Sequence, residues 1–273
     1  MKKILALVMV VVLALSFTAC GAVKTADDFV DSVDGALVVA EKGSAGEELA
    51  TENEFFANTE YTAVDSMAKA LMDVASGTSD LALVDYVTSI GSIGEGTDYE
   101  NLVVVKGHEF NPEEYGIAFR KGSDITPAVN AAIAELMNDG TMDGIAETYK
   151  LQELLIKDGK AQDDTYTAGD LAYVKEKGKM VIGITYFAPM NYMDANNNLI
   201  GFETEFAKAV CAKLGVEAEF VEINWNSKEI ELEAKKIDCI WNGMTITDER
   251  LANMSISVPY MNNKQVMVAR KAK

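Results

Sequence analysis

Histidine, cysteine and positive charge are the scarce features of this 273-residue chain. The single histidine, His108, excludes metal sites built from several histidines and leaves one candidate for a histidine-based catalytic triad. Lys and Arg number 24 against 43 Asp and Glu, which gives a net charge of −19 without any basic stretch. Because nucleic-acid affinity depends on neutralising phosphates, we expect no nucleic-acid partner. Glycine-rich phosphate-binding loops and the G-x-S-x-G nucleophile turn are also missing, which disfavours several large enzyme classes.

The composition is that of a folded protein, with 49% hydrophobic and 25% charged residues. This length accommodates one large domain or two smaller ones. Two cysteines lie in apolar surroundings: Cys211 on the apolar face of a predicted helix, and Cys239 in a run typical of a buried strand. They are too few for a structural zinc site. A disulfide and two buried free thiols both remain open.

The amino terminus has the features of an export signal. Lys2 and Lys3 precede an apolar run over residues 4–15, which is shorter than the roughly 20 residues that span a bilayer. Cys20 follows Thr18-Ala19 in a pattern that resembles the lipobox of bacterial lipoproteins, in which the cysteine is lipidated. We therefore expect a signal peptide over 1–19, a lipidated tether over 20–27 and an extracytoplasmic, membrane-anchored protein. An ordinary signal peptide with a chance cysteine is the alternative.

Strand-like and helix-like segments alternate along the rest of the chain, which predicts α/β structure with mostly parallel strands covered by helices. Ser44 and Glu47 have the spacing of a capping box at a helix start, and Thr126-Pro127 suggests another start. Residues 157–169 are polar and aperiodic and are predicted to be a linker. The sequence predicts strands over 36–40, 80–85, 102–105, 115–119, 180–184, 217–223, 237–241 and 266–270, and helices over 64–75, 126–138, 141–155, 170–176, 203–214 and 227–235.

Two groups of motifs resemble the solute-binding proteins of ABC importers for polar amino acids. Residues 178–270 resemble the first half of that family through GKMVIG at 178, GFE at 201, DCIWNGMTITDER at 238, SVPY at 257 and QVMV at 265. Residues 24–150 look like its second half through EKGS at 41, DLALVD at 80, YGIAFRKG at 115 and DGT at 139. The resemblance implies a two-lobed type II periplasmic-binding-protein architecture whose halves stand in circularly permuted order.

Permutation assigns each segment of the chain to a lobe. We expect the family's second lobe over 28–113, a crossover strand with helices returning to the first lobe over 114–156, the linker over 157–169, and the first lobe over 170–273. New termini at the usual lobe crossing would leave one strand, near residues 114–121, joining the lobes. The alternative is two independent tandem units.

The resemblance also implies a binding site for a free amino acid. In that family, the position of Arg250 holds the ligand carboxylate with help from Thr245, and the helix start at Ser44 and Ala45 supplies backbone donors. Asp85 corresponds to the residue that takes the ammonium group, together with carbonyl groups near Asn242 and Gly243. Phe187 and Trp225 match aromatic walls, and Glu41 matches a position that contacts the ligand side chain. Glu114 lies where the chain enters the crossover strand, and the two acids would favour a cationic or hydrogen-bond-donating ligand side chain. Each residue also has an ordinary structural role open to it: a salt bridge, a helix cap or core packing.

The expected function is capture of a free amino acid between two lobes and its delivery to an ABC permease, without a cofactor. A sensing or scavenging lipoprotein is the first alternative. The second is a cyclohexadienyl-dehydratase-like enzyme, for which Glu41, Asp85 and Glu114 would be the candidate acids or bases.

Overall fold

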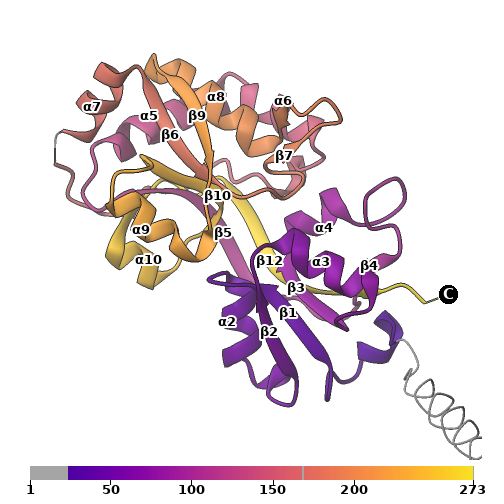
Figure 1. The fold of residues 1–273 in the computed structure, drawn as a ribbon. Coiled ribbons are helices and arrows are strands. Elements are labelled where there is room, and N and C mark those ends of the chain that lie inside the picture. Colours follow the sequence, from indigo (N-terminus) through magenta and orange to yellow (C-terminus); the bar gives the residue numbers. More distant parts are fainter. Residues whose placement is uncertain (1–23, 168, 273) are drawn as a thin grey trace, which may run out of the picture.

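The computed structural model describes residues 24–167 and 169–272, and these residues form two lobes joined by long strands (Figure 1). The predicted signal peptide and Cys20 lie outside the described residues. We use the name amino-terminal lobe for residues 24–109 with 265–272, and carboxy-terminal lobe for residues 116–260. The predicted α/β architecture with two lobes is confirmed.

The amino-terminal lobe packs helices against parallel strands β2-β1-β3. Its elements are η1 (Ala26–Phe29), β1 (Leu37–Glu41), α2 (Ala45–Glu52), η2 (Glu54–Phe56), β2 (Glu60–Val64), α3 (Met67–Ser76), β3 (Leu81–Asp85), α4 (Tyr86–Ser92) and β4 (Leu102–Val104).

The carboxy-terminal lobe is built around parallel strands β10-β6-β9. Its elements are α5 (Ile125–Asn138), α6 (Thr141–Thr148), η3 (Gln152–Leu154), α7 (Asp170–Lys177), β6 (Lys179–Ile184), β7 (Tyr192–Met193), β8 (Leu199–Ile200), α8 (Phe202–Leu214), β9 (Glu217–Glu222), η4 (Trp225–Ser227), α9 (Lys228–Glu233), β10 (Cys239–Thr245), α10 (Asp248–Asn253) and β11 (Met254–Ile256).

Two antiparallel strands run between the lobes, β5 (Phe110–Arg120) and β12 (Met261–Arg270), and they sit at the centre of one sheet in the order β2-β1-β3-β12-β5-β10-β6-β9 (Figure 1). The prediction of a single crossing strand was therefore wrong. Residues 265–270 of β12 pair with β3 and β4, so the structure puts them in the amino-terminal lobe rather than with 170–264. The reason is physical: the buried run from Val266 to Ala269 completes the sheet of that lobe.

Local element boundaries differ from the sequence prediction where polar side chains set the ends. Residues 60–64 form strand β2, and helix α3 begins only at Met67 because Ser66 Oγ caps it by accepting from Lys69 N. Helix α5 begins at Ile125, and the expected cap Thr126 is instead buried within its first turn. Helix α6 ends at Thr148, just before Lys150 takes a positive φ of 61°.

The described residues of the predicted linker, 157–167, carry no helix or strand and run along the carboxy-terminal lobe. Thr167 N donates to Gly122 O at 2.7 Å, and Asp164 pairs with Lys121 at 3.3 Å. Gly159 lies so close to Pro259 that a Cβ there would come within 2.2 Å of the Pro259 carbonyl oxygen. Both ends of the linker therefore belong to one lobe, which excludes two independent tandem units.

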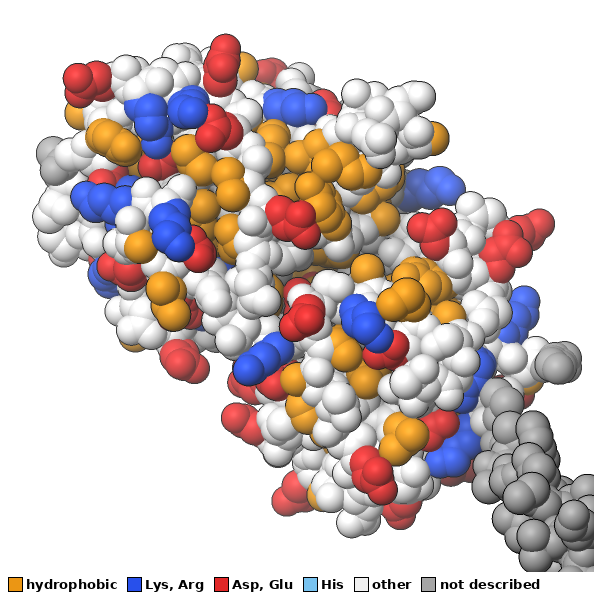
Figure 2. Space-filling model, in the orientation of Figure 1, with side chains coloured by type: hydrophobic (Ala, Val, Ile, Leu, Met, Phe, Trp, Pro, Cys, Tyr) orange, Lys and Arg blue, Asp and Glu red, His pale blue; other side chains and the backbone are white. Residues whose placement is uncertain are grey.

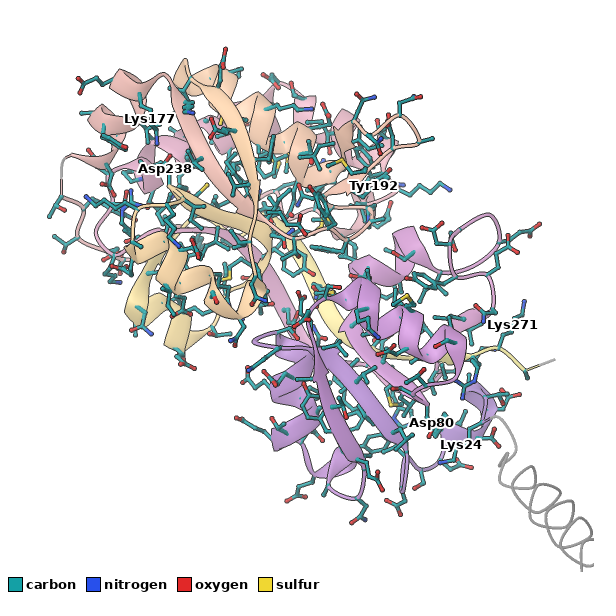
Figure 3. The ribbon with its side chains drawn as sticks, in the orientation of Figure 1. Lys24, Asp80, Lys177, Tyr192, Asp238 and Lys271 are labelled. Carbon is teal, nitrogen blue, oxygen red and sulfur yellow. The ribbon has the colours of Figure 1, made fainter. Side chains whose placement is uncertain are left out.

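The ends of the described chain meet on the other lobe. Asp80 accepts from Lys24 Nζ at 3.5 Å and from Arg270 Nη2 at 3.4 Å. Figure 3 shows Lys24, Asp80 and Lys271 at the end of the amino-terminal lobe that lies away from the carboxy-terminal lobe.

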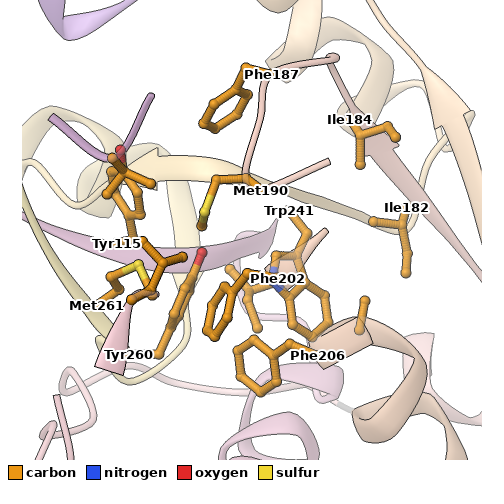
Figure 4. Close-up of a cluster of buried hydrophobic side chains, with 14 of the residues drawn as sticks. Tyr115, Ile182, Ile184, Phe187, Met190, Phe202, Phe206, Trp241, Tyr260 and Met261 are labelled. Carbon is orange, nitrogen blue, oxygen red and sulfur yellow. The ribbon is translucent and has the colours of Figure 1, made fainter. Parts of the chain in front are cut away.

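The core of the carboxy-terminal lobe reaches the crossing strands through aromatic side chains (Figure 4). Trp241 is fully buried and meets Phe206 edge-on at 4.9 Å between ring centroids, as expected of a core residue. Cys211 and Cys239 are both buried free thiols in this core, which settles the alternative left open by the sequence.

Acidic side chains are spread over both lobes on the face seen in Figure 2. Within the described part of the chain, no helix has both the length and the apolar character needed to cross a membrane.

Candidate functional site

A row of polar side chains crosses the centre of the sheet where the lobes face each other. Pairing brings Gln265 of β12 opposite Asp85 of β3, and Asn263 of β12 opposite Glu113 of β5. Thr245 at the end of β10 pairs with Tyr115, two residues along from Glu113. The row lies at the carboxyl ends of the parallel strands, where ligands bind in open α/β sheets.

Asp85 is the most enclosed carboxylate of this row. It is 4% exposed, and its side chain accepts from Tyr115 Oη at 2.6 Å and from the Gln265 amide. Burial raises the pKa of Asp85, while the hydrogen bonds from Tyr115 and Gln265 and the charge of Arg250 oppose the rise. Within the described residues no cation lies within salt-bridge distance of Asp85, so its charge has donors but no counter-ion in contact.

Glu113 is a second buried carboxylate beside Asp85. It accepts from Asn263 Nδ2 at 2.6 Å, from Thr245 Oγ1 at 3.3 Å and from Gln265 Nε2 at 3.1 Å. Burial and then the nearby charge of Asp85 raise the pKa of Glu113 to about 8. One amide nitrogen, Gln265 Nε2, thus bridges two carboxylates, and Gln265 Oε1 on the other side of the same amide is buried without a donor among the described residues.

Glu41 ends β1 next to this pair and is 2% exposed. Its Oε1 has no hydrogen-bond partner in the described chain. Burial and then Asp85 raise the pKa of Glu41 to about 8, against the charge of Lys228. A buried carboxylate oxygen without a donor is costly unless a ligand or water supplies one.

Arg250 faces the row from the carboxy-terminal lobe. It lies in the first turn of α10, whose cap Thr247 accepts from Arg250 N at 3.2 Å. Its Nη1 donates to Thr245 O at 2.7 Å. No carboxylate of the described residues lies within salt-bridge distance of its guanidinium, and Arg250 lines a groove of about 510 Å³ together with Ser44, Lys228 and Glu249. The fork of donors is therefore positioned by one carbonyl and available to an anion.

The opposite wall of this groove is the start of α2. Ser44 caps the helix by accepting from Glu47 N at 3.3 Å, as the capping-box pattern predicts. Glu47 reaches back one residue further than expected, because its carboxylate accepts from Gly43 N at 2.6 Å. Ala45 N–H and Gly46 N–H are the first two helical donors, which have no intrahelical acceptor and, with the helix dipole, favour an anion.

Asn242 and Gly243 lie where β10 passes the cleft. The Asn242 amide is occupied: its Oδ1 accepts from Thr185 N at 2.8 Å and its Nδ2 donates to Thr185 O at 3.0 Å. Gly243 has φ of +54°, and a Cβ there would come within 3.0 Å of the Phe187 ring. Its N–H donates to buried Glu203 at 2.8 Å, which fixes the direction of this peptide.

The two predicted aromatic walls belong to different buried clusters. Phe187 is 4% exposed and separates Gly243 from a hollow of about 190 Å³ that Tyr99, Tyr186 and Tyr192 line with it. Trp225 packs into a buried cluster beneath β10, and Lys228 Nζ lies 4.7 Å from its ring centroid.

Glu114 does not join the site. Its side chain is exposed, and its backbone carbonyl accepts a hydrogen bond from Ile246 N at 2.9 Å. Side chains alternate along a strand, so burial of Tyr115 also turns Glu113 inward and Glu114 outward. That alternation was available in the sequence and identifies Glu113, which the sequence prediction missed. Gln265 and Asn263 were also missed, because their positions depend on pairing between distant strands. Lys228 was missed because it reaches Gly43 only when the two lobes meet.

The lobes are in contact on both sides of the site. Lys228 Nζ donates to Gly43 O at 3.1 Å on one side. On the other, Gly91 of α4 packs against Ala188 and Pro189, and a Cβ at Gly91 would come within 2.5 Å of Pro189 N. The two lobes therefore contact each other at Gly43 and at Gly91.

Comparison with known proteins finds similarity concentrated at the carboxy-terminal end. Residues 180–273 match the bacterial extracellular solute-binding proteins, family 3. The L-cystine-binding protein TcyJ of Escherichia coli strain K12 is 37% identical over 93 residues, which is 34% of this chain and 35% of that protein. The ABC transporter arginine-binding protein 1 of the same strain is 34% identical over 100 residues, 37% of this chain and 41% of that protein. The chain thus spans less than half the length of these curated relatives, both named as binding proteins.

Among solved structures, a match is found to the arginine-bound form of domain 1 from TmArgBP, crystallised as a Phe57Trp mutant. The sequence identity is 33% and the TM-score is 0.33, and the match covers 37% of this chain and 84% of that chain.

Proposed function

We propose that the chain, residues 180–273 of which match the bacterial extracellular solute-binding proteins, family 3, captures a free amino acid between its two lobes. The observation that carries the proposal is the division of the site. Donors that contact no carboxylate of the described residues, the Arg250 guanidinium and the first N–H groups of α2, lie at one end. Buried carboxylates and orphaned acceptors around Asp85 lie at the other.

A zwitterion removed from water needs partners for both of its charges. In our proposal the ligand carboxylate lies between the Arg250 guanidinium and the N–H groups of Ala45 and Gly46. Each lobe contributes one of these partners, so the carboxylate holds the lobes together. This is how ligand binding favours the closed arrangement.

The ammonium group of the ligand lies against Asp85 in this proposal. An ammonium has three donors, and the site offers Asp85 together with Glu41 Oε1 and Gln265 Oε1, both buried without a donor in the described chain. A carbonyl from Gly243 adds a further acceptor. The Asn242 side chain contributes by holding Thr185 rather than by touching the ligand.

The ligand side chain extends between Phe187 and Trp225, past Glu41 and Lys228. Glu41 gives this region a hydrogen-bond acceptor and Lys228, the pKa of which burial and then Arg250 lower to about 8, gives it a donor. This pairing favours a polar side chain, and two relatives are named for polar amino acids, cystine and arginine.

We further propose that the protein is a circularly permuted lipoprotein, anchored through Cys20, that delivers its amino acid to an ABC permease. The meeting of Lys24 and Arg270 at Asp80 supports permutation, and so does a linker confined to the other lobe. The described chain enters through η1, whose Phe29 is buried in the amino-terminal lobe, so that lobe would lie nearest the membrane.

A thermal-shift screen of residues 21–273 against the twenty L-amino acids tests the proposal. A ligand at 100 times its dissociation constant stabilises the protein by about 2.7 kcal/mol, which is a shift of a few degrees at this size. We expect a shift with a small set of polar amino acids. A flat response to all twenty would contradict the proposed ligand class.

A further inference from the structure

The carboxylates at the centre of the sheet outnumber what one ammonium group requires. Asp85, Glu113 and Glu41 come from three strands and are each more than nine-tenths buried. Two of them, Asp85 and Glu113, are held by one Gln265 amide nitrogen. Their proximity is set by pairing of β3, β12 and β5, so it does not depend on how the lobes are placed.

The elements packed around Asp85 and Glu113 bring few positive charges near the two carboxylates. Strand β5 adds the Tyr115 phenol, β1 adds Glu41 and α8 adds Glu203, none of them cationic. Arg250 on α10 acts on both carboxylates through space, and Lys228 on α9 acts on Glu41. Within the described residues neither cation is within salt-bridge distance of the pair, and the groups in contact with it are all neutral donors.

Two buried carboxylates joined by a single neutral donor are strongly disfavoured when both are ionised, because like charges at close range in a low dielectric repel. A shared proton removes that repulsion, as in other coupled carboxylate pairs. We infer that Asp85 and Glu113 share one proton while the site is empty, and that the ammonium group of an incoming amino acid displaces this proton to solvent.

The exchange balances in charge and atoms. One ammonium enters with its three N–H donors, one proton leaves to water, and no covalent bond to carbon changes. The inference rests on the proposed function, because it needs an ammonium as the entering group. Its consequence is that protons compete with the amino acid, so affinity increases with pH up to about 8, the value to which burial and Asp85 raise the pKa of Glu113.

The empty protein can be tested without any ligand. Infrared spectra recorded between about pH 5 and pH 9 would follow the carbonyl stretch of a protonated buried carboxylic acid. We expect wild type and Glu114→Gln, the exposed neighbour, to lose the same band amplitude near pH 8. Glu113→Gln should lose a smaller amplitude there, the remainder coming from Glu41, whose pKa burial and Asp85 also raise to about 8. Two results would overturn the inference that Asp85 and Glu113 share a proton. In the first, wild type has already lost every acid band when the pH reaches about 6. In the second, Glu113→Gln titrates in the same way as wild type.

Calorimetry then measures the exchange. The probe is the L-amino acid that gives the largest thermal shift, titrated near pH 6.5 in buffers of low and high ionisation enthalpy. The dependence of observed heat on buffer gives the protons released, which should be about one for wild type and Glu114→Gln and about none for Glu113→Gln. Binding with no net proton release by wild type would overturn the inference while leaving the proposed function intact. If Glu113→Gln fails to fold, a wild-type count of none still overturns the inference.

Failure of the proposed function has a different signature. In that case none of the twenty amino acids binds, which also overturns the exchange, whereas the infrared titration of the empty protein still reports whether Asp85 and Glu113 share a proton.

Discussion

Tyr115, on a strand that crosses between the lobes, donates a 2.6 Å hydrogen bond to Asp85, the last residue of β3. Both side chains are buried. The bond ties the proposed ammonium-binding carboxylate to the crossing strand and favours its ionised form.

Substitution Tyr115→Phe removes this bond and keeps the ring. The pKa of Asp85 should rise further, since one of the contributions that lower it is lost. Hydrogen bonds to charged groups are worth about 1.5–3 kcal/mol, so amino-acid affinity should fall by roughly tenfold to a hundredfold. Isothermal titration calorimetry measures this, with Tyr149→Phe as the control, because Tyr149 bonds Gly201 N away from the site. Equal affinity of both variants would remove Asp85 from the ligand site.

Gly91 is needed for the close approach of the two lobes. A Cβ there would come within 2.5 Å of Pro189 N, which belongs to the facing lobe. We expect Gly91→Ala to fold normally but to bind amino acids more weakly, with a larger radius of gyration in the liganded state. Small-angle scattering with and without amino acid measures this. In the control Gly144→Ala, the added methyl group meets nothing within 4 Å. A liganded Gly91→Ala as compact as wild type would show that this contact does not limit closure.

Cleavage within the linker should leave a folded, ligand-binding protein. Residues 161–163 are exposed and lie apart from the tightly packed Gly159. A protease site inserted between Gln162 and Asp163 should give two fragments that stay together, because β5 and β12 lie side by side in one sheet. Size-exclusion chromatography would detect them as one particle, and separate fragments would contradict the shared sheet.

The converse rearrangement tests permutation. A chain that starts at Asp163, joins Lys271 to Lys24 through a short flexible linker and ends at Gln162 restores the family's order of halves. It should fold and bind the same amino acids as the natural order, because its new junction lies where the present ends already meet at Asp80. Circular dichroism and the thermal-shift screen provide the readouts. An unfolded product would argue against permutation.

Much of the fold follows from local pattern. The buried run at 81–84 and the cap at Ser44 are properties of a few consecutive residues, and both were predicted correctly. Strand β2 was missed because its alternation is weak and its side chains are mostly exposed. The second crossing strand was missed because residues 262–265 are polar, and Asn263 and Gln265 are buried only through pairing with β5 and β3.

The site also contains both residues that a local motif identifies and residues that only the fold brings together. Arg250 and its cap Thr247 are one local motif, and Arg250 lines the groove between the lobes. Gln265 lies 180 residues from Asp85 in the chain, so no local pattern could bring them together. Strand alternation from buried Tyr115 would have pointed to buried Glu113 rather than to exposed Glu114.

The central claim is that Arg250 binds the carboxylate of a free amino acid, and one titration tests it most directly. Wild type, Arg250→Lys and Arg250→Ala would each be titrated with the best-binding L-amino acid and with its carboxamide derivative, which lacks the anionic group. We predict that wild type strongly prefers the free acid. Arg250→Lys should bind it weakly because a point charge replaces a two-pronged donor, and Arg250→Ala should show no measurable preference. Undiminished affinity for the free acid in Arg250→Ala would contradict the proposed binding mode.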